Sequence, residues 1–373
     1  MQIKEIKKRI IQIIQTSIAL LSGKTSKYPN QVINFEKKIS EFFGSKHCLT
    51  FSSGTAAART ILVAAGVRKN SKILMSKISF PSVISTALEI GADIEYLDFD
   101  ENLQIKNISE LTKPDADFLI ITHSYGIPQN MKNIMDFLKK NKNIQLIEDF
   151  SHAQGAKFDD KYIGTYGIGS FMSMQGSKAL SAGEGGVMIT NDENIYEKSI
   201  VLSHINRKHS FKNKDLENFS KVGLLGKARA HPMGIILSEI DLNELKKKNK
   251  ATSKKFQVLF NKLKSNNQIK IPQMNFGDLG GFHYGFPFFC NNKTILEKLR
   301  SILPIIKYDW PCCDEFDEFK SSESFNNLLY SLKMNNQLSD YKDQRSYLNF
   351  VDLNWIQKKS LKEIDFILKK NDF

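Results

Sequence analysis

Short apolar runs of strand length alternate with amphipathic stretches of helix length over the first two thirds of the chain. The runs are bounded by Gly, Ser, Asn and Asp, and the stretches between them repeat apolar residues at helical spacing. This alternation predicts βαβ units and a mostly parallel sheet flanked by helices, an α/β fold. The expected strands are residues 48–51, 72–75, 118–122, 144–149 and 187–190.

The helix ahead of the first strand is marked by its ends. Phe35 and Ile39 repeat at helical spacing, Asn34 is placed to cap the helix, and Gly44 is placed to close it. A second helix is expected over residues 131–140, between two apolar runs. Both helices therefore fit the alternating pattern.

The N-terminal residues 1–22 place isoleucines along one helical stripe. Lys7, Lys8 and Arg9 followed by an apolar stretch resemble the start of a signal peptide, but polar residues dilute that stretch and no small-residue cleavage site follows. We therefore expect an amphipathic helical arm. No later stretch is apolar enough over a sufficient length to span a bilayer, so no membrane partner is expected.

Length and charge narrow the classes further. Single cores stop growing at about 250–300 residues, so the 373 residues predict a large domain over 23–243 and a smaller C-terminal α/β domain over 244–373. The net charge is +13, but the lysines are scattered among asparagines and no nucleic-acid-binding motif occurs. Four cysteines without a CxxC spacing favour a reducing cytoplasm and predict neither disulfides nor a zinc site.

Two residues stand out as candidate chemistry. Asp149 ends an apolar strand, and Lys178 precedes the glycine-rich GEGG before another strand. Ligands of open α/β sheets bind at the carboxyl ends of strands. A lysine that holds pyridoxal 5'-phosphate as a Schiff base, together with a carboxylate that keeps the pyridine nitrogen protonated, would have this pattern. An aspartate at a strand end also serves often as a helix cap or turn residue, so the pattern alone leaves both readings open.

The whole stretch from 146 to 192 resembles the signature of the DegT/DnrJ/EryC1/StrS aminotransferases, which are sugar aminotransferases of the pyridoxal-phosphate fold type I. The residues that match the family pattern are Glu148, Asp149, Ser151, His152, Gly155 and Ala156, followed by Ser173, Lys178, Gly183, Glu184, Gly185 and Gly186. The resemblance covers roughly residues 23–242 well and the last third poorly. It implies an aspartate aminotransferase-like fold, with a large domain built on a seven-stranded sheet.

The resemblance also implies roles for individual residues. Gly54 and Thr55, in a turn that resembles the family's SGT, and Ser173 would hold the cofactor phosphate, and Phe80 would stack on the pyridine ring. His152 would bond to the cofactor's phenolate oxygen or to the substrate. Lys227 occupies a position that in relatives is an asparagine reaching the neighbouring subunit's cofactor phosphate. The catalytic residues implied are Lys178 and Asp149, and no metal is expected.

Several further residues remain ambiguous from the sequence. His123 lies at a strand end, where a structural role is at least as plausible as an acid role, and it is left out of the catalytic set. Tyr284 and the cluster 308–311 could line a substrate pocket, although core packing explains them equally well.

The resemblance points to a transaminase that moves an amino group from L-glutamate or another amino donor to an anionic keto acceptor. A nucleotide-linked keto-sugar of cell-surface polysaccharide synthesis is the expected acceptor, and a homodimer with shared active sites is implied. A small phosphorylated ketone as acceptor, a lyase or synthase on the same fold, and a non-catalytic regulatory relative remain alternatives. A dehydratase branch of the family replaces the lysine with histidine, so Lys178 argues against it.

Overall fold

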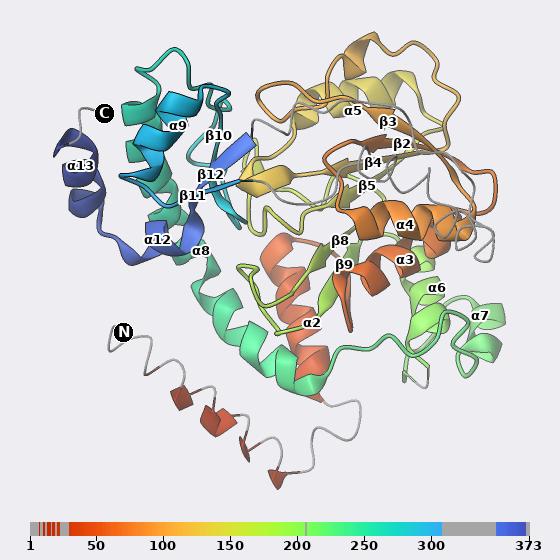
Figure 1. Ribbon diagram of the computed structural model, residues 1–373. Coiled ribbons are helices and arrows are strands. Elements are labelled where there is room, and N and C mark those ends of the chain that lie inside the picture. The colour runs from red at the N-terminus through yellow and green to blue at the C-terminus, as the bar shows by residue number, and fades with distance from the viewer. Residues whose placement is uncertain are drawn as a thin grey trace, which may run out of the picture. The chain divides into compact units, whose positions relative to one another are not determined.

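The computed structural model in Figure 1 describes residues 30–205, 207–307 and 348–370, together with scattered positions between 7 and 22. The chain divides into two compact units, Met1–Gly66 with Gly164–Lys246, and Val67–Ile163 with Lys247–Phe373. Most of the predicted N-terminal arm and all of the cluster 308–311 lie outside the described residues. The predicted division of the chain at residues 243 and 244 stays a prediction.

The first unit is built on antiparallel strands. Strand β9 pairs antiparallel with β1 on one side and with β8 on the other. Its elements are α2 (Asn30–Phe43), β1 (His47–Phe51), α3 (Gly54–Ala65), β8 (Gly169–Ser173), β9 (Gly186–Thr190), α6 (Glu193–Ser203), α7 (Lys214–Phe219) and the first part of α8 (Pro232–Leu263). The strands expected near residues 48 and 187 are therefore confirmed.

The predicted cap at Asn34 is wrong. Helix α2 already includes Asn30, and Asn34 lies inside it with an exposed side chain. The apolar stripe starts at Val32, which is buried together with Phe35 and Ile39. The helix thus begins before Asn34, because burial of one face stabilises a helix more than a cap does.

The second unit contains the parallel part of the large sheet, in the order β5-β4-β2-β3. Helices follow β2 and β4, as the alternating pattern predicted. The elements are β2 (Lys72–Ser76), α4 (Pro81–Ile90), β3 (Asp93–Leu97), η1 (Ile108–Glu110), β4 (Phe118–Thr122), η2 (Ser124–Gly126), α5 (Met131–Lys140), β5 (Gln145–Asp149), and the short hairpin of β6 (Lys157–Phe158) and β7 (Lys161–Tyr162).

The C-terminal part of this unit forms its own three-stranded antiparallel sheet with β12 in the centre. Its elements are β10 (Gly285–Phe289), α9 (Lys293–Arg300), β11 (Ile305–Lys307), β12 (Leu348–Asp352), α12 (Leu353–Lys358) and α13 (Leu361–Lys370). The core of this part is aromatic: Phe286, Phe288 and Phe350 are fully buried. Large buried aromatic side chains contribute much of the hydrophobic stabilisation of a core.

The large sheet has seven strands, three in the first unit and four in the second. The strand number and the mixture of strand directions agree with the fold expected from the sequence. None of the helices in the described residues is both long and apolar enough to cross a membrane.

Candidate functional site

The start of helix α3 is held against the end of strand β8. Ser53 caps the helix: its hydroxyl accepts from the amide of Ala56 at 3.0 Å. A Cβ added to Gly54 would lie only 2.8 Å from the Cβ of Ser173, so only glycine lets the two segments approach this closely. The first N–H groups of a helix point out along its axis and carry partial positive charge. Gly54, Thr55 and Ser173 therefore come together as a site suited to a phosphate.

Lys178 lies in the loop between β8 and β9, which is closed by its own backbone. Met174 donates its amide to the carbonyl of Gly185 and accepts from Ala182, both at 2.8 Å. Inside this ring the amide of Lys178 donates to the carbonyl of Gln175 at 2.9 Å. Gly183 adopts a positive φ of 77°, a conformation that favours glycine. The loop therefore carries its lysine on a hydrogen-bonded backbone directly after the strand that ends at Ser173.

Lys227 is exposed beside the strand that leads into α3. The neighbouring Ala228 accepts from the amide of Ser52 at 2.8 Å, and Phe51 forms an antiparallel bridge with Arg229. The segment that carries Lys227 thus lies next to its own chain's Ser52. The predicted contact of Lys227 with a partner subunit's phosphate is not tested by these bonds.

Asp149 ends β5, the strand next to β4 in the parallel part of the sheet. Its side chain is buried, and Oδ1 accepts from the amide of Ser151 at 2.9 Å. Its backbone carbonyl accepts from the amide of His123 at 2.9 Å. The carboxylate is therefore fixed at the carboxyl edge of the sheet, the edge where open α/β folds bind ligands.

Phe80 reaches the same sheet edge from β2. It immediately precedes α4, and its neighbour Ser79 lies 3.2 Å, hydroxyl to hydroxyl, from Thr122, which pairs in register with Asp149. Phe80 is 37% exposed, although aromatic side chains are usually buried. A ring left exposed near a buried carboxylate is consistent with stacking on a planar ligand.

His123 orients the segment that ends in Asp149. Its Nδ1 accepts from the amide of Gln129 at 3.0 Å, so Nε2 carries the proton and donates to Glu148 Oε2 at 3.1 Å. Both His123 and Glu148 are fully buried. The sequence left His123 with a structural or an acid role, and these bonds give it a structural one.

His152 belongs to a cluster of rings on the second unit. Its ring lies 4.4 Å from the His283 ring and 5.5 Å from the Tyr125 ring, centroid to centroid. The amide of His283 also approaches the carbonyl of His152 at 3.5 Å. Tyr284, a residue that the sequence left ambiguous, contacts the same rings. His283 was missed by sequence reasoning, although the adjacent Gly280 and Gly281 signal a close backbone approach.

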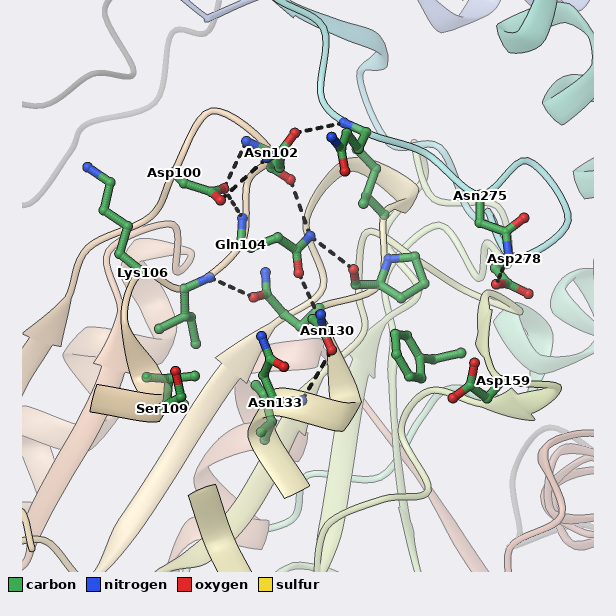
Figure 2. A pocket seen from close by; sticks show the side chains of 18 of the residues that line it. Asp100, Asn102, Gln104, Lys106, Ser109, Asn130, Asn133, Asp159, Asn275 and Asp278 are labelled. Atoms are coloured by element: carbon green, nitrogen blue, oxygen red, sulfur yellow. Dashed lines mark hydrogen bonds between the residues drawn. The ribbon is translucent and has the colours of Figure 1, made fainter. Parts of the chain in front are cut away.

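A separate hollow of about 880 Å³ lies on the second unit and is lined by amides and carboxylates together with apolar side chains (Figure 2). Asp100 Oδ1 accepts from the amides of Asn102 and Gln104, and the amide of Asn130 donates to Gln104. Burial raises the pKa of Asp278 in its wall. No predicted site residue lines this hollow. The bonds among Asp100, Gln104 and Asn130 hold the loops of this wall together.

The sequence profile of the DegT/DnrJ/EryC1/StrS aminotransferase family matches residues 4–303. The chain belongs to this family. The match extends about sixty residues beyond residues 23–242, which contain the family motifs. The family resemblance expected from the sequence is confirmed, and it reaches into the C-terminal third.

Individual members of the family show how far the similarity goes. The chain is 28% identical over 196 residues to GDP-perosamine synthase of Escherichia coli O157:H7. That alignment covers 48% of this chain and 54% of the relative. It is 26% identical over 354 residues to UDP-4-amino-4,6-dideoxy-N-acetyl-beta-L-altrosamine transaminase of Campylobacter jejuni, covering 91% and 90% of the two chains. The chain spans about half the length or less of the first curated relatives that it matches.

Solved structures establish the fold of this family member. GDP-4-keto-6-deoxy-D-mannose-3-dehydratase of E. coli, whose structure holds bound hydrated pyridoxal phosphate, superimposes with a TM-score of 0.76 at 20% identity. The superposition covers 96% of this chain and 95% of that chain. The pyridoxal-phosphate fold type I expected from the sequence is thereby confirmed.

Proposed function

We propose that the protein is a pyridoxal-phosphate-dependent aminotransferase that transfers an amino group from L-glutamate to a nucleotide-linked keto-sugar. Lys178 is the observation on which this assignment depends, because the chain belongs to an aminotransferase family and this lysine lies in the closed loop after β8. The N-terminus of α3, which is suited to a phosphate, lies against the end of the same strand. Asp149 supports it as a buried carboxylate at the sheet edge.

The described residues fit the cofactor part by part. On the first unit, the N-terminus of α3 and Ser173 would hold the phosphate. Only a glycine at position 54 lets these two segments lie this close together. On the second unit, Asp149 would accept a hydrogen bond from the pyridine N–H, and the exposed Phe80 would cover one ring face. When bound, pyridoxal phosphate supplies an electron sink for a carbanion next to its imine carbon.

The chain's own groups then provide the proton transfers and their setting. The Lys178 amine is the general base that takes the Cα proton of the donor and the general acid that returns a proton during transfer. The Asp149 carboxylate would keep the proton on the ring nitrogen. His123 and Glu148 hold the strand end so that Asp149 stays in place. His152, held by the ring of His283, would bond to the cofactor's phenolate oxygen or to the substrate.

The names of the relatives support the substrate class. GDP-perosamine synthase and the transaminase of a UDP-linked amino sugar are both named for nucleotide-linked sugars. A further structure of fold type I is described with a trapped adduct of pyridoxal phosphate and glutamate, at 20% identity. A net charge of +13 suits an anionic diphosphate-linked acceptor. Polysaccharide synthesis is the pathway class that such acceptors serve.

We further propose that the protein acts in the cytoplasm as a homodimer. Activated nucleotide sugars are cytoplasmic intermediates, and none of the described helices could cross a membrane. Lys227, exposed on the segment beside Ser52, would reach the phosphate of the partner subunit's cofactor. As an ammonium it would act on the phosphate as a point charge.

Absorbance spectroscopy of the purified protein tests the assignment directly. Wild-type protein is expected to show the visible band of lysine-bound cofactor, and L-glutamate is expected to convert it to the near-ultraviolet band of the amine form. Lys178→Ala should lack the visible band, whereas Lys214→Ala, at an exposed lysine of α7, should behave as wild type. Wild-type protein that binds no pyridoxal phosphate would refute the assignment.

The acceptor requires a separate product analysis. The amine form of the enzyme, freed of glutamate, is mixed with a GDP- or UDP-linked 4-keto-6-deoxy sugar, and the product is identified by mass spectrometry. An amino sugar together with regenerated visible absorbance supports the proposed reaction. A deoxy sugar without added nitrogen would indicate dehydratase chemistry, and cleavage of a substrate bond would indicate a lyase.

A further inference from the structure

Four potential metal ligands converge on the first unit, away from the sheet edge described above. His47 is the first residue of β1, Glu193 and Glu197 lie one turn apart on α6, and His209 lies in the segment after α6. The donor atoms of Glu193, Glu197 and His209 all lie within 4.8 Å of one another. His47 Nε2 joins them at 3.8 Å from Glu193 Oε1.

These separations are near those of a tetrahedral site. Zinc bonds of about 2.0–2.2 Å to nitrogen and oxygen place neighbouring donor atoms about 3.3–3.5 Å apart. His209 Nε2 lies 3.4 Å from Glu197 Oε1, and the His47–Glu193 separation is slightly longer. Nε2 of His209 is buried and forms no hydrogen bond with the described residues. Glu193, Glu197 and His209 thus surround one position, and His47 would join them from its place beside Glu193.

The surrounding groups hold these ligands in place. The Tyr196 ring stacks on His47 at 4.4 Å and meets His209 edge-on at 5.3 Å, centroid to centroid. Glu197, whose side chain is only 1% exposed, accepts from the amides of Lys212 and Asn213. Each carboxylate oxygen has a second lone pair, so these bonds orient Glu197 without using up its capacity to bind a metal. Outer contacts of this kind typically fix the ligands of metal sites.

Lys212 is the competitor for this position. Its ammonium pairs with Glu193, which shows that the cluster already attracts a cation. The Lys212 side chain is 76% exposed, and exposed ion pairs contribute at most about 1 kcal/mol. A metal ion could therefore displace the ammonium at low cost.

We propose that His47, Glu193, Glu197 and His209 form a binding site for a borderline divalent transition metal, with zinc the best fit. Two imidazoles and two carboxylates suit Zn²⁺ or Cu²⁺, whereas Mg²⁺ and Ca²⁺ prefer oxygen ligands alone. The metal would tie the start of β1, helix α6 and the segment after α6 together, and would thereby stabilise the first unit.

Zinc binding to chelator-treated, cofactor-loaded protein tests the site by isothermal titration calorimetry. Wild type should bind one Zn²⁺ per chain. His209→Ala should bind Zn²⁺ at least about ten-fold more weakly, because loss even of a group that only orients a ligand typically lowers metal affinity by that factor. Lys212→Ala should bind more tightly, because the competing ammonium is gone. His231→Ala, an exposed histidine of the same unit, should bind as wild type.

Cobalt and thermal unfolding complete the test. Co²⁺ in the proposed site should give the visible bands of a four-coordinate site with nitrogen and oxygen ligands. It should not give the intense near-ultraviolet absorption that thiolate ligands, such as those of Cys312 and Cys313, would produce. Zinc should raise the unfolding temperature of wild type but not of His47→Ala/His209→Ala. An affinity equal in all variants, or thiolate absorption, would mean adventitious binding and would overturn the site. So would weaker binding by Lys212→Ala.

Discussion

His123 Nε2 lies 3.1 Å from Glu148 Oε2, and both side chains are fully buried. The pair connects two strand ends, because His123 follows β4 and Glu148 is the penultimate residue of β5. The amide of His123 donates in addition to the carbonyl of Asp149. The position of the proposed cofactor partner Asp149 thus depends on a hydrogen bond made by its neighbour in sequence.

We expect Glu148→Ala to lower the free energy of unfolding by about 1–3 kcal/mol, because the buried Nε2–H of His123 loses its acceptor. The same change should weaken retention of pyridoxal phosphate, since the end of β5 that holds Asp149 is loosened. Urea unfolding measures the first effect. Loss of cofactor absorbance during dialysis measures the second.

Glu148→Gln is the matched control, because the amide oxygen of glutamine can accept the same hydrogen bond from His123. It should recover most of the stability and of the cofactor retention. Equal losses in Glu148→Ala and Glu148→Gln would show that the carboxylate charge matters and the hydrogen bond does not.

Gly54→Ala should disable the proposed phosphate site with little effect elsewhere. The new methyl group would lie 2.8 Å from the Cβ and 2.9 Å from the Cα of Ser173. A contact that close forces the start of α3 away from β8, so we expect at least a ten-fold loss of affinity for the cofactor, about 1.4 kcal/mol. Titration of the cofactor-free protein with pyridoxal phosphate measures it. Gly66→Ala is the control, at a glycine with open space around it and a φ of 103°. It should lower the free energy of unfolding but leave the affinity for pyridoxal phosphate unchanged.

Stability should fall in mild acid because of His204. Burial, followed by the charges of Arg207 and Arg229, holds the pKa of His204 well below its usual value of 6.5. Below pH 6.5 the unfolded chain therefore binds a proton that the folded chain does not, and this one site removes up to about 1.4 kcal/mol per pH unit. Above pH 6.5 it contributes no slope. Urea unfolding midpoints between pH 5 and 8 should show this change, and His204→Phe should flatten it.

The helices and strands of the sheet were largely predictable because their signals are local. Helix α5 runs over Met131–Lys140 as expected, with Asn130 as its cap and Ile134 and Phe137 on its buried face. Asp100 also acts locally, accepting from two amides of its own turn. The start of α2 was missed because Asn34 looks like a cap, although the apolar stripe begins before it.

Long-range partnerships could not be predicted from one sequence. His123 and Glu148 are 25 residues apart and meet only because β4 and β5 pair in parallel. His152 and His283 meet because a glycine pair lets a distant loop approach, which needs φ values of 71° at Gly281 and 53° at Phe282. Periodicity indicates which face of an element is buried, but not which element covers it. The family resemblance supplied the proposed cofactor residues, and the structure added the groups that position them.

Arg207→Met should destabilise the first unit by about 3–5 kcal/mol, because it removes the partner of a buried charge. Arg207 Nη2 donates to Glu36 Oε2 at 2.7 Å, and both side chains are less than 10% exposed. Thr50 donates its amide and hydroxyl to the other oxygen of Glu36, so the carboxylate joins α2 to β1 as well.

Lys214→Ala, which breaks an exposed pair with Glu217, should cost less than about 1 kcal/mol. Adding Glu36→Gln to Arg207→Met should restore part of the loss in urea unfolding, since a neutral amide is cheaper to bury than a lone carboxylate. A double variant less stable than Arg207→Met alone would show that the charge of Glu36 is balanced by groups other than Arg207.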